Sequence, residues 1–129
     1  MTAHRILQLN AFATGASAVA MLAARGSLYP LFGLSSPILL DLLAISFLVY
    51  AGALALTASR RPVSRTALIV FTAADGAWVV ASALCLLLFW PDLTPIGRAL
   101  VIAAAVVVDV FAMLQFRAAG RSPSVPQIA

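Results

Sequence analysis

Four apolar stretches fill nearly all of this chain of 129 residues, and its charged side chains lie mostly in the gaps between them. A bilayer core of roughly 30 Å needs roughly 20 helical residues to cross it, and each stretch is about that long. Charged residues make up only 9% of the chain and hydrophobic residues 64%, whereas a soluble domain carries about 25% charged residues. The sequence therefore predicts an all-α integral membrane protein, a four-helix bundle.

The predicted spans lie near 6–24, 37–58, 64–90 and 95–117, within one domain over residues 1–120. The second and fourth spans begin alike, because Ser36 and Thr94 each precede a proline that suits the first turn of a helix. For the first span, a cleavable signal peptide with Arg5 as its charged leader is the alternative. Residues 121–129 are expected to form a loosely ordered cytoplasmic tail.

Arginine placement predicts the orientation of the bundle. One side holds Arg5, Arg60, Arg61, Arg65, Arg117 and Arg121. The other side holds only Arg25 and Arg98, so the excess of positive charge predicts that both termini are cytoplasmic. The preference for Ala, Val, Leu and Arg over Lys and Ile is typical of a GC-rich bacterial genome, which indicates a bacterial inner membrane. Because the arginines flank spans, the expected partner is the lipid bilayer, and nucleic acid is not expected despite a pI near 10.7.

Two aspartates lie near the middle of their spans. Asp75 follows Arg65 by ten residues and Asp109 precedes Arg117 by eight, so both are about 12 to 15 Å from the cytoplasmic edge. No cation inside the spans can balance them, which makes the uncharged acid the cheaper form. Ionisable groups in the hydrocarbon are costly and usually functional. The candidate proton or ion site therefore comprises Asp75, Asp109, Ser17, Thr72 and Tyr50.

A structural role for the same acids is the alternative. Each aspartic acid would then donate a hydrogen bond to a neighbouring helix and fix the register of the bundle. In the first span, Asn10, Thr14 and Ser17 fall at i, i+4 and i+7, which predicts one polar stripe that packs against the other helices. Small residues beside it would allow close helix contacts.

Catalytic and metal-binding motifs are absent from the sequence. His4 is the single histidine and cannot form a metal site alone, so we expect it to be a solvated residue at the interface. No zinc-protease, phosphate-loop or serine-histidine pattern occurs. We therefore expect no enzymatic activity, no metal and no cofactor.

In its number of spans, its length and its intramembrane acid, the chain resembles the small multidrug resistance transporters. That family places its proton-coupled site on a glutamate in the first span, and this first span has no acidic residue. The function of that family is therefore not carried over. In hydropathy and length the chain is also similar to bacterial four-helix proteins of the DoxX-like kind.

Two functions follow from these observations. The first is a building block without enzymatic machinery, namely a structural or accessory subunit of a larger membrane complex or a homo-oligomer. It rests on the missing catalytic motifs and on the small residues along the helices. The alternative is a small proton-linked transporter or channel in which Asp75 and Asp109 bind the coupling ion.

Overall fold

The computed structural model describes residues 1–121, which are almost entirely helical. Its elements are α1 (Ala3–Ala23), α2 (Arg25–Leu28), the 3-10 helix η1 (Tyr29–Phe32), α3 (Ile38–Ser59), α4 (Arg65–Phe89) and α5 (Pro95–Arg121). Four of them, α1, α3, α4 and α5, are long and apolar enough to cross a membrane. The prediction of an all-α chain with four spans is confirmed.

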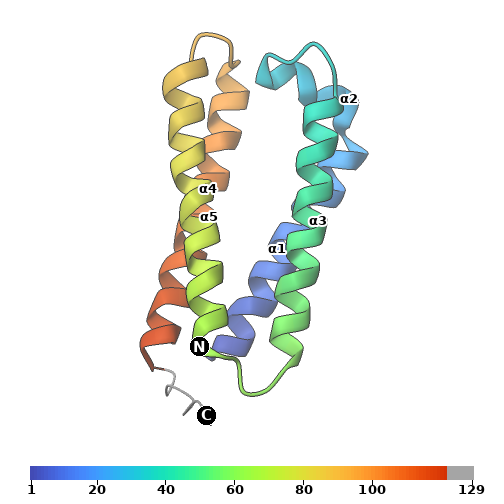
Figure 1. Ribbon diagram of the computed structural model, residues 1–129. Coiled ribbons are helices and arrows are strands. Elements are labelled where there is room, and N and C mark those ends of the chain that lie inside the picture. Colours follow the sequence, from blue (N-terminus) through green and yellow to red (C-terminus); the bar gives the residue numbers. More distant parts are fainter. Residues whose placement is uncertain (122–129) are drawn as a thin grey trace.

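The four spans are arranged as two helical pairs. Helix α1 packs along α3, and α4 packs along α5 (Figure 1). The pairs approach each other at the end where α1 begins and α5 ends, here called the terminal end, and diverge toward the other end (Figure 1). Between the pairs at the terminal end lies a hydrophobic core made of Ile6, Leu7, Leu54, Ala58, Leu68, Phe71, Ala118 and Ala119. This core draws on all four spans, so the terminal end is where the bundle is best packed.

The polarity of the bundle is the reverse of that of a soluble protein. Its buried polar side chains are Asn10, Asp75, Ser82 and Gln115. Large apolar side chains such as Phe12, Val49 and Leu87 are more than two-thirds exposed, on three different spans. Soluble monomers rarely expose large contiguous apolar surfaces, because water solvates them poorly. The chain is a multi-pass membrane protein.

Local capping explains where the spans begin. Helix α1 starts three residues before its predicted beginning, because the Thr2 hydroxyl accepts a hydrogen bond from the Arg5 amide. At α5 the predicted cap is present, since the Thr94 hydroxyl accepts from the Gly97 amide at 3.1 Å. Helix α3 begins one residue later than predicted, at Ile38 with Pro37 as its N-cap, and the Ser36 hydroxyl accepts from the Ile38 amide.

The C-terminal end of α5 extends beyond its predicted limit and reaches Arg121. Good helix formers, among them Arg117, Ala118 and Ala119, continue the span, and the Arg121 guanidinium donates to the Met1 carbonyl at 3.2 Å. The predicted tail otherwise falls on residues 122–129, which lie outside the described residues.

The connection between α1 and α3 packs onto the turn between α4 and α5. The Leu31 carbonyl in η1 accepts from both the backbone amide and the hydroxyl of Thr94. Gly97 lies so close to the Leu31 carbonyl that a Cβ atom there would overlap it. Gly33, with φ +70°, lies in the same way against the Asp92 carbonyl. Backbone contacts therefore join the two helical pairs at the end where they diverge.

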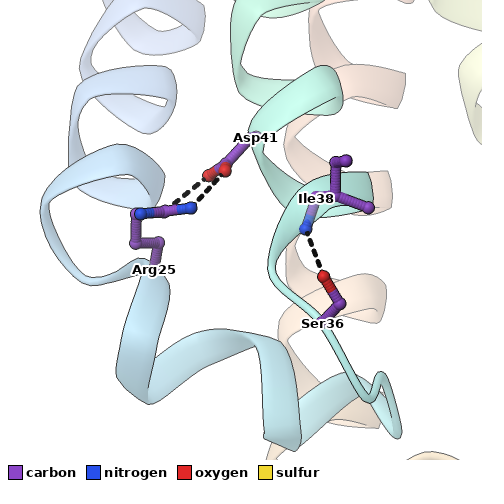
Figure 2. A network of polar contacts seen from close by, with 4 residues as sticks. All are labelled: Arg25, Ser36, Ile38 and Asp41. Atoms are coloured by element: carbon purple, nitrogen blue, oxygen red, sulfur yellow. Dashed lines mark hydrogen bonds and ion pairs between the residues drawn. The ribbon is translucent and has the colours of Figure 1, made fainter.

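Both arginines at this end contact protein groups. The Arg25 guanidinium donates to the two Asp41 carboxylate oxygens at 2.9 and 2.5 Å, which links α2 to the start of α3 (Figure 2). These hydrogen bonds, and the charge of Asp41, raise the pKa of Arg25 above its ordinary value. Arg98 lies over the Trp90 ring, 4.2 Å from its centroid, and donates to the Trp90 carbonyl. In the same close-up, the Ser36 hydroxyl accepts from the Ile38 amide (Figure 2).

Candidate functional site

Asp75 lies at the meeting point of all four spans and is 4% exposed. Its Oδ1 accepts a hydrogen bond from the Tyr50 hydroxyl of α3 at 2.7 Å. Its Oδ2 accepts from Asn10 Nδ2 of α1 at 3.0 Å and from Gln115 Nε2 of α5 at 2.5 Å. Each span thus contributes one side chain to this group, Asn10, Tyr50, Asp75 and Gln115, which we call the Asp75 cluster.

Contacts with neighbouring residues hold the three partners of Asp75 in place. The Thr14 hydroxyl, one turn further along α1, donates to Asn10 Oδ1 at 3.1 Å. Gln115 Nε2 also donates to the Phe111 carbonyl at 3.0 Å. The Tyr50 ring packs edge-on against Phe71 with a centroid distance of 5.7 Å. The cluster is therefore preorganised around the carboxyl group of Asp75.

The hydrogen-bonding pattern of the cluster suits an ionised carboxylate. Asp75 accepts from three donors, and a carboxylate is acceptor-only, so every one of these bonds is satisfied. A neutral acid would need an acceptor for its proton. Gln115 Oε1 is buried and has no hydrogen-bond partner. Rotation of the Gln115 amide would turn that oxygen toward Asp75, but it would also break the hydrogen bond that Nε2 donates to the Phe111 carbonyl.

Asp109 lies apart from this cluster. It is exposed on α5 and forms neither a hydrogen bond nor an ion pair within the part of the chain that the structure describes. Six residues separate it from Gln115, which turns an α-helix through about 600°, so the two side chains leave α5 about 120° apart. The structure therefore does not bring Asp75 and Asp109 together. Similar predicted depth suggested their pairing, but Gln115, about 9 Å further along α5, is the residue that lies level with Asp75 and faces it.

The other predicted site residues divide in the same way. Tyr50 belongs to the Asp75 cluster, whereas Thr72 and Ser17 donate to backbone carbonyls of their own helices, both at 2.7 Å. Within the predicted polar stripe, the Thr14 hydroxyl donates a hydrogen bond to Asn10, whereas Ser17 is exposed. The stripe thus faces the bundle at Asn10 and Thr14 only.

Gln115 is the member of the cluster that sequence reasoning missed. Gln115 is fully buried. The sequence feature that could have identified it is a polar amide side chain inside the last predicted span, six residues after Asp109. His4 also differs from the expected solvated residue, because its Nδ1 lies 2.5 Å from the Ala58 carbonyl and links α1 to α3. Among residues 1–121, no group of three His, Cys, Asp or Glu side chains could hold a metal ion.

No protein family matches this chain, and searches of curated proteins and of solved structures give no significant match.

Proposed function

We propose that this protein is a non-catalytic building block of a membrane assembly in a bacterial inner membrane, acting as an accessory subunit or as a homo-oligomer. The observation that supports this most directly is the exposure of Asp109. It stands about 21 Å from the Pro95 end of α5 and about 18 Å from the Arg121 end, at 1.5 Å per residue. An exposed acid at this position would lie in the middle of the hydrocarbon.

The side chains around Asp109 support a lateral interface on physical grounds. Ile102, Val106, Met113 and Phe116 lie on the same face of α5 and are all exposed. An aspartate at the centre of a bilayer costs about 2.5 to 3.5 kcal/mol. A partner helix that offers a hydrogen bond at the same depth would remove much of this cost, since helices in lipid associate through packing and such bonds.

A second copy of the chain satisfies this requirement without any further component. A two-fold axis along the membrane normal places identical residues opposite each other at equal depth. Asp109 would then face Asp109 of the second copy, and a neutral acid could donate its proton to the other carboxylate. An accessory subunit would instead supply its own polar group to this face. In both cases the Asp75 cluster has the separate role of holding the four spans of one copy together.

Native mass spectrometry from mild detergent tests this proposal. We expect the natural chain to appear as a homo-oligomer or with a stoichiometric partner, and Asp109→Leu to appear mainly as a monomer with unchanged helicity. Asp109→Asn keeps a hydrogen-bonding group and should retain more of the complex. The matched control is Ser46→Leu, because Ser46 is also exposed within a span but its hydroxyl donates to its own helix at Leu42.

Two results would contradict the proposal. One is a natural chain that stays monomeric at every ratio of protein to detergent. The other is loss of the complex in Ser46→Leu to the same degree as in Asp109→Leu, because the interface would then not depend on Asp109.

The proposed orientation places both termini in the cytoplasm. Its support is the excess of arginine in the terminal segments and in the loop between α3 and α4. A fluorescent protein that folds only in the cytoplasm, fused to the C-terminus, should fluoresce. A fusion protein that is produced at normal abundance but does not fluoresce would indicate the opposite orientation.

A proton-linked carrier is the second candidate, and one feature of the Asp75 cluster favours it. The unpartnered Gln115 Oε1 belongs to an amide that can rotate, so protonation of Asp75 could be coupled to a change in hydrogen bonding. Proteoliposomes loaded with a pH-sensitive dye test this. A proton flux in the natural chain that disappears in Asp75→Asn, while the helical bundle remains folded, would favour transport over assembly.

A further inference from the structure

A groove lies in the elbow between the end of α3 and the start of α4. Its volume is about 440 Å³, which is within the range of small-molecule sites. Ala53 and Leu56 of α3, Val63 before α4 and Ala67 within α4 form its apolar lining. Arg60 lines the same groove. The groove therefore combines an apolar wall with a cation.

The elbow carries a concentration of positive charge that the protein does not neutralise. Arg60, Arg61 and Arg65 lie within six residues, and none of their guanidinium groups forms an ion pair or hydrogen bond in the described part of the chain. The nearest aspartate in sequence, Asp75, lies ten residues along α4 from Arg65, about 15 Å away. This contrasts with the opposite end of the bundle, where both arginines have partners in the protein.

We propose that this elbow binds an anionic phospholipid. The phosphate would lie at Arg60, with Arg61 and Arg65 adding charge, and one acyl chain would lie along Ala53 and Leu56. Guanidinium groups bind phosphate through charge-assisted hydrogen bonds, and basic pockets between spans at the membrane surface recognise anionic headgroups. The Ser64 hydroxyl is not counted as a ligand, because it accepts from the Ala67 amide as the cap of α4.

The apolar lining distinguishes a phospholipid from a free anion. Leu56 is 66% exposed at the end of a span, where an acyl chain begins in a bilayer. Inorganic phosphate would use the arginines but leave this surface uncovered. A zwitterionic lipid would cover the surface but bring no net charge to the three arginines. Only an anionic lipid matches both halves of the groove.

The test is native mass spectrometry of the full chain in mild detergent, titrated with phosphatidylglycerol or with phosphatidylcholine of the same acyl chains. We expect clear preference for phosphatidylglycerol, and about fivefold weaker binding for each arginine replaced in the elbow. Arg60→Gln tests the headgroup, and Leu56→Trp fills the groove without changing charge. Both substitutions are at exposed positions, so folding should be preserved.

Arg117→Gln is the matched control, since Arg117 is exposed at the same end of the bundle and does not line the groove. It should bind phosphatidylglycerol as the natural chain does. Equal binding of the two lipids, or equal losses in Arg117→Gln and Arg60→Gln, would overturn the proposal. If Leu56→Trp binds phosphatidylglycerol as the natural chain does, and millimolar inorganic phosphate displaces the lipid, the arginines would instead form a site for a free anion.

Discussion

Replacing Asp75 by leucine should weaken the bundle more than any other single polar change in the spans. Among residues 1–121, Asp75 is the one side chain that accepts hydrogen bonds from three other spans, through Asn10, Tyr50 and Gln115. Leucine removes every acceptor and is also larger than aspartate. Three donors would then lose this acceptor, and the buried Asn10 amide would be left with no other, whereas Tyr50 and Gln115 each retain a backbone carbonyl as a second acceptor.

The size of the effect follows from these three bonds. Hydrogen bonds between helices in a membrane contribute about 0.6 kcal/mol each, so their loss accounts for about 2 kcal/mol. Donors that remain buried without a partner add about 1 to 3 kcal/mol. We therefore expect Asp75→Leu to lower the free energy of unfolding by about 3 to 5 kcal/mol. Asp75→Asn keeps one accepting oxygen and should cost about 1 kcal/mol.

The measurement is reversible unfolding in mixed micelles, in which circular dichroism follows the helix content as the fraction of SDS rises. Thr72→Val is the matched control, because the Thr72 hydroxyl donates to Leu68 within α4 and joins no other span. A double-mutant cycle with Gln115→Leu should show that the effects of the two changes are not additive. An Asp75→Leu bundle as stable as the natural one would refute the reasoning, since the cluster would then contribute no net stability.

Two further predictions concern the end where the helical pairs diverge. Gly97→Ala should destabilise the bundle by about 1 to 3 kcal/mol in the same assay, because the new methyl group overlaps the Leu31 carbonyl. Gly76→Ala is the control, since a methyl group there would lie in open space and should be neutral or stabilising. Equal effects of the two substitutions would contradict the close contact at Gly97. In a double-mutant cycle, Arg25→Gln and Asp41→Asn should show a small coupling energy, because the two side chains form an exposed ion pair. This coupling energy should decrease at high salt, which screens the charges. A coupling energy that salt does not change would contradict an exposed ion pair.

The architecture could be predicted from the sequence because the length of each apolar stretch is set by the bilayer and hardly depends on tertiary contacts. The helix ends were less predictable. Thr94 caps α5 as expected, whereas α3 has Pro37 as its N-cap and the Ser36 hydroxyl accepts only from the Ile38 amide, although both hydroxyl residues precede proline. The difference is tertiary: Thr94 is held by two hydrogen bonds to the Leu31 carbonyl, and the sequence gives no sign of that contact.

The candidate site was predictable in part. A buried acid must find hydrogen-bond partners in a membrane, so Asp75 could be identified from its depth and its type alone. Tyr50 could be placed at a similar depth by counting residues. Gln115 could not be chosen over Asp109 in this way, because the two lie about 9 Å apart along α5, and both the rotation of α5 and its position along its axis depend on how it packs against α1 and α4. That choice is made by small buried residues such as Ala112, which carry no polar signal.

The two intramembrane acids can therefore have opposite roles. Asp75 faces three donors, so it is satisfied within one copy of the chain and ties the spans of that copy together. Asp109 faces outward, so whatever satisfies it in a bilayer must come from outside that copy. If both acids served only the fold of one chain, leucine at either position would have a similar effect on its stability. A loss of stability at Asp75 and a loss of association at Asp109 would separate the two roles.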